Sequence, residues 1–385
     1  MVLKKLKPCR SASPGLGRMR GKRSLLSRAA VGVVLFSFAF FLNGCSSLGP
    51  ATLKGNRYNY NTTIQRSNDQ QLLLNLVRLK YRDTPFFLEV NSVAAQFKFR
   101  VNANADATLV EAVKGVFGIG VGVSMEENPT ISYAPLQGEQ FIQRFLAHIP
   151  LQNIFLLIRS GWSIERILRV CLERVGNLKN APTASGPTPE IAPVYEDFAE
   201  AANLIRKLQL MDAYTLSLGA RRNIPELIFQ FEKTGDGLPE LRKLNSLLGL
   251  PPDGLRFVLT THTTPDNEQH VRVDTRSLLG MMYYLSHAVE APEEDRARGK
   301  VTLTRYLSGK PFNWSDVTGD ILQVHSQSNR PSEAAMAIYY RDSWFYINDS
   351  DLQSKSTFSL LAQIFSLQSG NAKDKGPLLT LPLGN

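Results

Sequence analysis

The first 45 residues limit what this chain can fold into, because they have the pattern of a cleaved leader followed by a lipid-anchored cysteine. A long basic segment precedes an apolar run from Ala29 to Leu42. This run is shorter than the about 20 residues that a bilayer-spanning helix needs, but it suits the core of a signal peptide. We therefore expect residues 1–44 to be removed and only the rest of the chain to fold.

A lipid anchor is predicted at Cys45. The leader closes on Leu42-Asn43-Gly44-Cys45, with a small residue directly before the cysteine, as in bacterial lipoproteins. Such a cysteine is diacylglycerylated on its thiol and acylated on its amino group, and several acyl chains anchor a protein more firmly than one. Ser46 and Ser47 follow without an aspartate, which favours the outer membrane with the chain facing the periplasm.

Two alternatives accompany this interpretation. Met19 offers a second start, because Met19–Arg23 would begin an ordinary compact leader. Cys45 would be incidental if the leader were a plain secretory one.

The net charge of +10 belongs to the leader rather than to the folded chain. Residues 1–44 contain nine lysines and arginines and no acidic residue, which leaves about +1 for the remainder. No electrostatic footprint for phosphates remains, so nucleic acid is not expected as a partner. The predicted partners are the membrane, through the anchor at Cys45, and other envelope proteins; the oligomeric state is open.

Only one of the three cysteines remains for the folded chain. Cys9 leaves with the leader and Cys45 is acylated, so no internal disulfide can form. Cys171 lies on the apolar face of a predicted helix, and we expect a small core residue there rather than a catalytic thiol.

The predicted fold class is α+β, with helices packed on mostly antiparallel sheets in two domains. Residues 45–60 are expected to form a lipidated tether, and 61–179 and 194–385 the two domains. Residues 180–193 contain four prolines and no hydrophobic period, which predicts a linker or long exposed loop between them.

Hydrophobic spacing predicts the elements of both domains. In the first domain we expect helices at 62–81, 106–114, 137–148, 151–160 and 163–176, the last capped by Ser163, with strands at 86–101 and 115–125. In the second we expect helices at 194–209, 238–249, 276–289 and 351–369. Its strands are expected at 213–218, 226–232, 255–262, 269–274 and 378–382, with a hairpin of Ala335–Arg341 and Trp344–Ile347 turned at Asp342-Ser343.

The glycine-rich run Gly115–Met125 alternates small and apolar residues, which is typical of a strand rather than of a phosphate-binding loop. We expect it to pair with the run beginning at Phe86. Its apolar residues should pack on the helices at 137–176, with the glycine face open to a partner. Insertion of this segment into the outer membrane within an oligomer is an alternative. The charges of Glu89, Lys98 and Arg100, on both faces of a regular strand, argue against it.

Candidate ligands and catalytic groups are few. His148 and His287 are expected to pack or cap, and His262, Asp266 and His270 bracket a predicted hairpin turn that favours solvation over zinc binding. The acidic Asp349-Ser350-Asp351 is explained by a capping box of Ser350 and Gln353. Common motifs of esterases, metalloproteases and penicillin-binding proteins are absent from the sequence. We therefore predict no catalytic, cofactor or metal residues.

Four blocks of the chain resemble a family of proteobacterial outer-membrane lipoproteins with no assigned activity. The blocks are Gln71–Pro85, Thr130–Gly138, Thr275–Gly280 and Trp344–Phe358. The resemblance implies a place in the cell envelope and supplies no site residue.

These observations favour a non-enzymatic structural or adaptor subunit of an envelope assembly. The alternatives are an envelope polymer hydrolase, or an oligomeric lipoprotein that inserts an amphipathic β-segment into the outer membrane.

Overall fold

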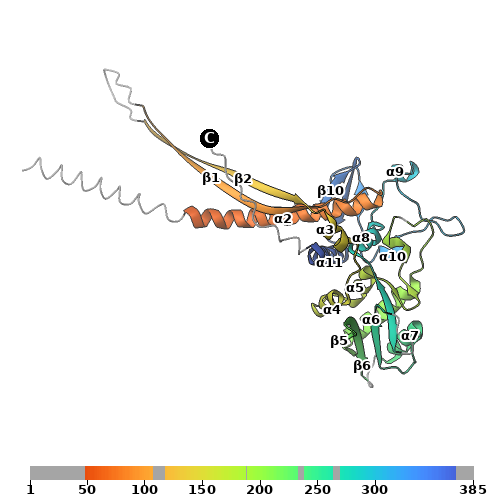
Figure 1. Cartoon of the computed structure of the whole chain (residues 1–385). Coiled ribbons are helices and arrows are strands. Elements are labelled where there is room, and N and C mark those ends of the chain that lie inside the picture. Colours follow the sequence, from red (N-terminus) through yellow and green to blue (C-terminus); the bar gives the residue numbers. More distant parts are fainter. Residues whose placement is uncertain (1–47, 107–117, 188, 233–237, 263–268, 370–385) are drawn as a thin grey trace, which may run out of the picture. The chain divides into compact units, whose positions relative to one another are not determined.

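The computed structural model describes residues 48–106, 118–187, 189–232, 238–262 and 269–369, apart from the side chains of 48–57, 94–129 and Leu238. Helices pack against mostly antiparallel sheets, so the predicted α+β class is confirmed (Figure 1). No helix within the described ranges is long and apolar enough to cross a membrane. Residues 64–385 form one compact unit, and residues up to Thr63 belong to another.

Helix α2 (Leu48–Lys80) begins well before the predicted residue 62 and includes much of the expected tether. Its later turns have an apolar face that is fully or nearly fully buried, made by Leu72, Leu73, Leu76, Val77 and Leu79. The helix stops where Arg82 takes a left-handed φ of 62°. Asn75 then fixes the exit of the chain, because its amide exchanges hydrogen bonds of 2.8 and 2.9 Å with the backbone of Phe86.

Strands β1 (Leu88–Asp106) and β2 (Gly118–Pro135) form an antiparallel two-stranded sheet, which we call the ribbon. The predicted pairing of the glycine strand is thus confirmed for Gly118–Met125, whereas residues 115–117 and the helical candidate at 107–114 lie outside the described residues. The packing of the apolar face on the following helices stays a prediction, because the side chains involved are not described.

A β-bulge in the ribbon changes which residues share a face. Val90 pairs with Tyr133 and Ser92 with Ser132, so Asn91 is an extra residue and the alternation of β1 shifts there by one. Glu89, Lys98 and Arg100 therefore fall on one face of the ribbon, and the expectation that they lie on both faces is wrong. The other face carries Leu88, Val90, Val93, Ala95, Phe97, Phe99, Val101, Ala103 and Ala105 of β1. These are in register with Pro135, Tyr133, Ile131, Pro129, Glu127, Met125, Val123, Val121 and Ile119 of β2.

Three helices follow the ribbon: α3 (Glu139–Leu146), α4 (Leu151–Arg159) and α5 (Ile164–Cys171). The predicted helix 163–176 is too long, because the chain becomes strand β3 (Leu172–Val175), which pairs with β4 (Leu178–Lys179) and β8 (His270–Thr275). Ser163 occupies the N-cap position but makes no side-chain cap bond. Gln209 supplies that acceptor instead, at 3.2 Å from the amide of Ile164.

A six-stranded sheet combines strands from both predicted domains, in the order β4-β3-β8-β7-β6-β5. Strands β5 (Tyr214–Arg221), β6 (Ile224–Phe231) and β7 (Arg256–Thr260) agree with expectation, as do helices α6 (Glu196–Leu210), α7 (Leu238–Leu248) and α8 (Leu278–Ser286). The expected hairpin of β7 and β8 is wrong, because the two strands are parallel, with Val258 opposite His270.

Within 180–187 and 189–193, buried residues alternate with exposed ones, so the segment is anchored in the structure rather than being a free linker. Asn180, Ala181 and Ala184 are buried, and a 3-10 turn η1 (Pro182–Ser185) lies against α8. One hydrophobic core runs through both predicted domains, and residues 64–385 are a single unit, so no domain boundary falls at this segment. The prolines accompany irregular backbone, and Pro189 is buried.

Arg276 joins this segment to the rest of the fold. Its side chain is fully buried and donates to the carbonyls of Arg169 at 2.9 Å, Val170 at 3.3 Å, Leu172 and Asn180, while Nε donates to Ser185 Oγ at 3.0 Å. The guanidinium also lies 4.0 Å from the ring centre of Tyr284. Within the described part of the chain no carboxylate pairs with it, so the cation is held by neutral acceptors alone.

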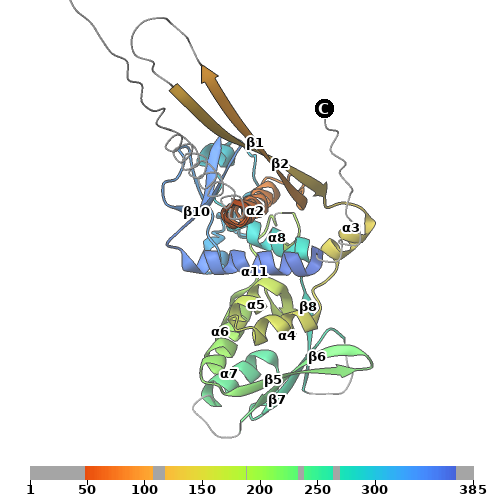
Figure 2. The ribbon, with the colours of Figure 1, turned by 90° about the vertical axis from the view of Figure 1, so that its left-hand side faces the viewer.

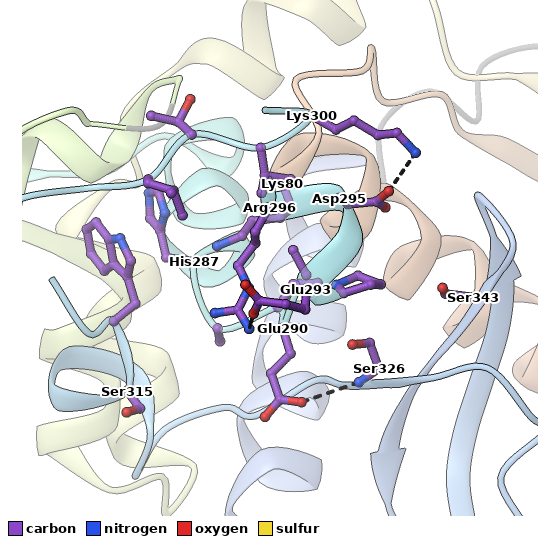
Figure 3. A pocket seen from close by; sticks show the side chains of 18 of the residues that line it. Lys80, His287, Glu290, Glu293, Asp295, Arg296, Lys300, Ser315, Ser326 and Ser343 are labelled. Atoms are coloured by element: carbon purple, nitrogen blue, oxygen red, sulfur yellow. Dashed lines mark hydrogen bonds and ion pairs between the residues drawn. The ribbon is translucent and has the colours of Figure 1, made fainter. Parts of the chain in front are cut away.

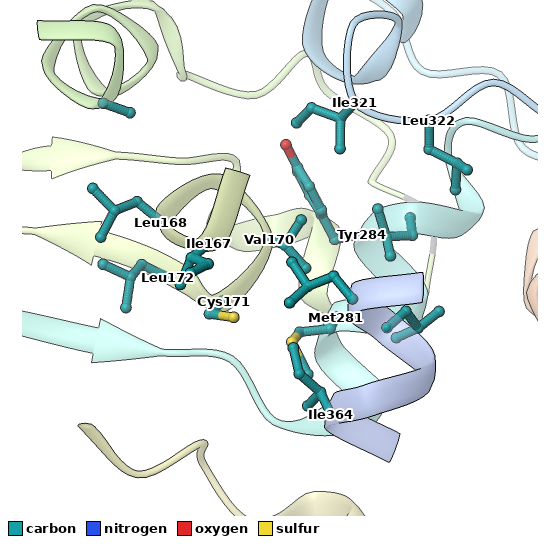
Figure 4. Close-up of a cluster of buried hydrophobic side chains, with 14 of the residues drawn as sticks. Ile167, Leu168, Val170, Cys171, Leu172, Met281, Tyr284, Ile321, Leu322 and Ile364 are labelled. Carbon is teal, nitrogen blue, oxygen red and sulfur yellow. The ribbon is translucent and has the colours of Figure 1, made fainter. Parts of the chain in front are cut away.

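The core beside this cation is built from α5, α8 and α11 (Leu352–Ser369) (Figures 2 and 4). Cys171 and Met281 bring their sulfur atoms into the same cluster of apolar side chains. Cys171 is free and fully buried, as predicted for a core residue.

The remaining elements are α9 (Glu293–Ala297), α10 (Ser315–Thr318), β9 (His325–Gln327), β10 (Ala334–Tyr340) and β11 (Ser343–Asn348). The predicted hairpin of β10 and β11 is confirmed, but its turn is Arg341-Asp342 rather than Asp342-Ser343. Both turn residues have positive φ, 48° and 64°, as a tight two-residue hairpin requires. The predicted strand at 378–382 lies outside the described residues.

We expect Arg276→Ala to destabilise the fold by about 3 kcal/mol or more, because four carbonyls and a hydroxyl lose their buried donor together. Urea unfolding, with the fluorescence of the tryptophans as signal, measures this. Arg272→Ala, at an exposed position of strand β8, which ends just before Arg276, is the matched control and should cost less than about 1 kcal/mol. Equal stabilities of the two variants would contradict the structural role of Arg276.

Candidate functional site

The predicted lipidation site, Cys45, lies outside the described residues. Cys171 is not a nucleophile in this fold, because burial raises the pKa of its thiol to about 12 and keeps it protonated. A functional site within the described residues must therefore be built from residues other than these two cysteines.

The histidines that the sequence groups together are separated. Because β7 and β8 are parallel, His270 lies opposite Val258, whereas His262 is exposed beyond the end of β7. Asp266 lies outside the described residues. His270 Nε2 is 3.8 Å from Glu226 Oε1, and no group of three or more histidine, cysteine, aspartate or glutamate side chains in the described ranges is arranged to hold a metal ion.

The acidic run before α11 has a structural role, as expected, but the cap is Asp351 rather than Ser350. The Asp351 carboxylate accepts the amides of Gln353 at 3.1 Å and Ser354 at 3.0 Å. Asp349 forms an ion pair of 2.7 Å with Lys355. These carboxylates are therefore engaged at a helix N-terminus.

A cavity of the described unit has a volume of about 1050 Å³ and is lined by many charged and polar side chains (Figure 3). Lys80, the last residue of α2, reaches it beside the segment that follows α8. The other walls come from α9, from residues 300–304 and 311–319, and from the turn between β10 and β11. We call this space the Lys80 cavity.

Asp295 anchors one wall of the Lys80 cavity. Its carboxylate accepts a hydrogen bond of 2.7 Å from the Tyr81 hydroxyl and one of 2.5 Å from Lys300 Nζ (Figure 3). Burial raises the pKa of Asp295, but the bonds from Lys300 and Tyr81 outweigh it and hold the pKa below its usual range. The carboxylate in this wall is therefore ionised and bonded to both Tyr81 and Lys300.

The three glutamates of the cavity also lie beside basic side chains. Glu293 lies 2.5 Å from Arg296 and Glu294 3.8 Å from Arg298. Glu290 lies 3.2 Å from His325 Nδ1 and accepts the amide of Ser326 at 3.4 Å. Arg341, on the opposite rim, pairs with Asp83 at 2.9 Å.

Lys80 differs from these residues because it has no counter-ion. It is 8 % exposed, and among the residues that the structure describes its ammonium has no hydrogen-bond or ion-pair partner. Burial, and then the positive charge of Arg296, lower its pKa to about 8. Its place at the C-terminal end of α2 partly compensates, since the helix dipole favours a cation there.

His287 stands beside Lys80 in the same wall. Its ring stacks on Trp314 with centroids 3.9 Å apart and planes inclined by 11°. Burial, and then Lys80, hold the pKa of His287 well below its usual range, so the ring is neutral. Neither ring nitrogen makes a hydrogen bond of normal geometry with the described residues, although the Ala184 backbone lies near enough to raise the pKa.

Sequence reasoning treated His287 as a packing or capping residue, and it does both: it is buried, and it is the C-cap of α8. The cavity it borders went unrecognised, and so did Lys80. A signal was available, because Lys80 continues the buried face of α2 at helical spacing from Leu73, Leu76 and Val77. A cation on an otherwise apolar stripe is a sign of a polar environment.

No protein-family model, curated protein or solved structure matches this chain.

We expect Lys80→Met to stabilise the fold at pH 7 by about 1 to 3 kcal/mol, because it removes a buried, unpaired charge. Since the folded pKa is lowered from 10.5 to about 8, the unfolded chain binds more protons between these values. The cost of Lys80 is therefore full below pH 8 and disappears as the pH rises towards 10.5. Denaturant unfolding at pH 7 and at pH 10 should show the advantage of the variant only at the lower pH.

Lys310→Met is the matched control, because Lys310 is exposed and does not line the cavity. It should leave the unfolding free energy unchanged at both pH values. A Lys80→Met variant less stable than the wild type at pH 7 would mean that the ammonium has a stabilising partner.

Proposed function

We propose that the protein is a lipid-anchored, non-enzymatic structural subunit of a bacterial envelope assembly, held through Cys45 at the periplasmic face of the outer membrane. The observation that carries the proposal is the ribbon: a long two-stranded sheet that pairs with no other described strand. The leader and the box ending at Cys45 support the location.

The ribbon needs a partner for two physical reasons. An isolated pair of strands is marginally stable in water, and both outer edges carry rows of unpaired backbone donors and acceptors. In addition, the bulge at Asn91 gathers apolar residues on one face over most of the length of both strands. A free edge and an apolar face together are typical of a surface that is covered by another chain.

The occupant we propose is a second copy of the same chain. In an antiparallel hairpin the outer edge of β1 is complementary in direction to the outer edge of β2, so ribbons of neighbouring copies continue the antiparallel order. Such a contact uses two different edges, which is a head-to-tail interface and closes into a ring when the rotation permits.

A second candidate function is insertion of that ring into the outer membrane. With Glu89, Lys98 and Arg100 on one face, the ribbon has the alternation of membrane-spanning strands, one face apolar and the other polar. The strands contain 19 and 18 residues, more than the about 9 to 11 that such a strand needs. Glu127 departs from the pattern, because it falls on the apolar face.

The envelope hydrolase considered from the sequence gains no support from the Lys80 cavity. Glycoside hydrolysis uses a protonated acid with a raised pKa beside an ionised carboxylate. The carboxylates of Glu293, Glu294 and Asp295 are instead paired with arginine or lysine, Glu290 lies beside His325, and the pKa of Asp295 is lowered.

The anchor is tested by metabolic labelling. We expect radiolabelled palmitate to enter the wild-type protein and not Cys45→Ala, because the thiol at this position receives the acyl glycerol. Cys171→Ala is the matched control and should label normally, since that thiol is buried. Equal labelling of wild type and Cys45→Ala, or no labelling of either, would remove the anchor from the proposal.

The assembly is tested with two charge substitutions at neighbouring positions of β1. Val101→Asp places a carboxylate on the apolar face, where covering it costs several kcal/mol, and should abolish multimers trapped by cross-linking in intact cells. Asn102→Asp adds the same charge to the polar face and should leave them. Multimers that survive both substitutions, or a wild-type protein recovered only as a monomer, would contradict assembly through the ribbon.

A further inference from the structure

The Lys80 cavity contains one lysine whose ammonium has no ion-pair partner among the described residues. Its other cations are paired, as Arg296 with Glu293, Arg298 with Glu294, Lys300 with Asp295 and Arg341 with Asp83. Asp342 also lines the cavity, but it is exposed at the rim. The only charged neighbour that perturbs Lys80 is Arg296, which is itself a cation.

A buried ammonium without a counter-ion destabilises a protein, and an anion that enters beside it removes that cost. Lys80 lines the cavity wall rather than being sealed in the core, so a ligand in the cavity can reach Nζ. The neutral ring of His287 lies next to it in the same wall, with both ring nitrogens buried. The polar group of this wall that is available to a ligand is thus the Lys80 ammonium.

We propose that the Lys80 cavity binds a hydroxylated monocarboxylic acid, with the ammonium of Lys80 as the counter-ion of its carboxylate. One unpaired ammonium matches a monovalent anion better than a phosphate dianion, which favours two cations. Arg296, the nearest second cation, is already engaged by Glu293.

The size and lining of the Lys80 cavity indicate a ligand larger than a simple carboxylate. The volume of about 1050 Å³ is far greater than acetate fills, and Ser315, Ser326 and Ser343 lie in the surrounding walls (Figure 3). Hydroxyl groups on the ligand would find donors and acceptors there. The inference does not depend on the anchor at Cys45 or on the ribbon, so it stands or falls separately from the proposed function.

The test is calorimetric titration of the mature chain at pH 7 with D-glucuronate as the probe. D-glucose is the uncharged control ligand, and inorganic phosphate is the competing anion. We expect glucuronate to bind the wild type and Lys310→Met equally, and at least about tenfold more weakly to Lys80→Met. Glucose should give no measurable heat, and phosphate should bind more weakly than glucuronate.

The pH dependence gives a second readout. The groups that face Lys80 from the packed elements are His287 after α8, Arg296 and Asp295 in α9, and Lys300 beyond it. His287 is neutral and Asp295 ionised at pH 7, so Lys80 is the group that titrates first on raising the pH. Glucuronate affinity should therefore fall as the pH rises above about 8, in the wild type but not in Lys80→Met.

Three results would overturn the proposal. They are no glucuronate binding to the wild type, equal binding to the wild type and Lys80→Met, and binding of glucose as tight as that of glucuronate. Tighter binding of phosphate would overturn the assignment to a monocarboxylate. Circular dichroism of Lys80→Met, which we expect to be folded, shows that lost binding reflects the missing ammonium.

Discussion

The fold depends on a buried cation that is surrounded by backbone carbonyls. A guanidinium carries five N–H donors and no acceptor, so Arg276 can be buried only where oxygen atoms are supplied in the right places. Those oxygens come from the end of α5, the start of β3, and residues 180–185. Asn180 reinforces the arrangement, because its side-chain amide donates to the carbonyls of Arg169 and Leu172. The cation thereby fixes segments that have no regular secondary structure to hold them.

The same interaction explains where hydrophobic spacing predicted the structure and where it did not. Helices α6, α7, α8 and α11 lie within a few residues of expectation, because the apolar residues of each are buried at helical spacing. Leu172 and Val175 continue the spacing of α5 but belong to a strand. The carbonyls of Arg169 and Leu172 bond to Arg276 and Asn180 instead of to amides one turn ahead. Periodicity cannot reveal a donor that comes from a distant part of the chain.

Composition misled in the segment 180–193 for a related reason. Prolines suggest exposure when a loop is considered alone, but they lack amide donors and leave carbonyls free for side chains. Here Arg276 bonds to the carbonyl of Asn180, and the Thr304 hydroxyl to that of Pro189. The cavity was missed because motif searches look for clusters, whereas its distinguishing residue is a single lysine among paired neighbours. Alternation in the sequence does not show which residues of the ribbon share a face. One inserted residue, Asn91, shifts the residues of β1 before it to the opposite face.

The carbonyl cage around Arg276 also sets the order in which the chain can fold. The donor for the Arg169 carbonyl lies 107 positions further along the sequence. During synthesis or translocation, the end of α5 and residues 180–185 emerge long before the guanidinium that holds them. Closing so long a loop is slow and entropically costly. Until it happens, the carbonyls of Arg169 and Leu172 have the nearby amide of Asn180 as a donor but lack the guanidinium. The central sheet forms late for the same reason, because β3 pairs with β8, which lies about a hundred residues further along the chain. Folding of this protein is therefore a late event, completed when its two halves meet.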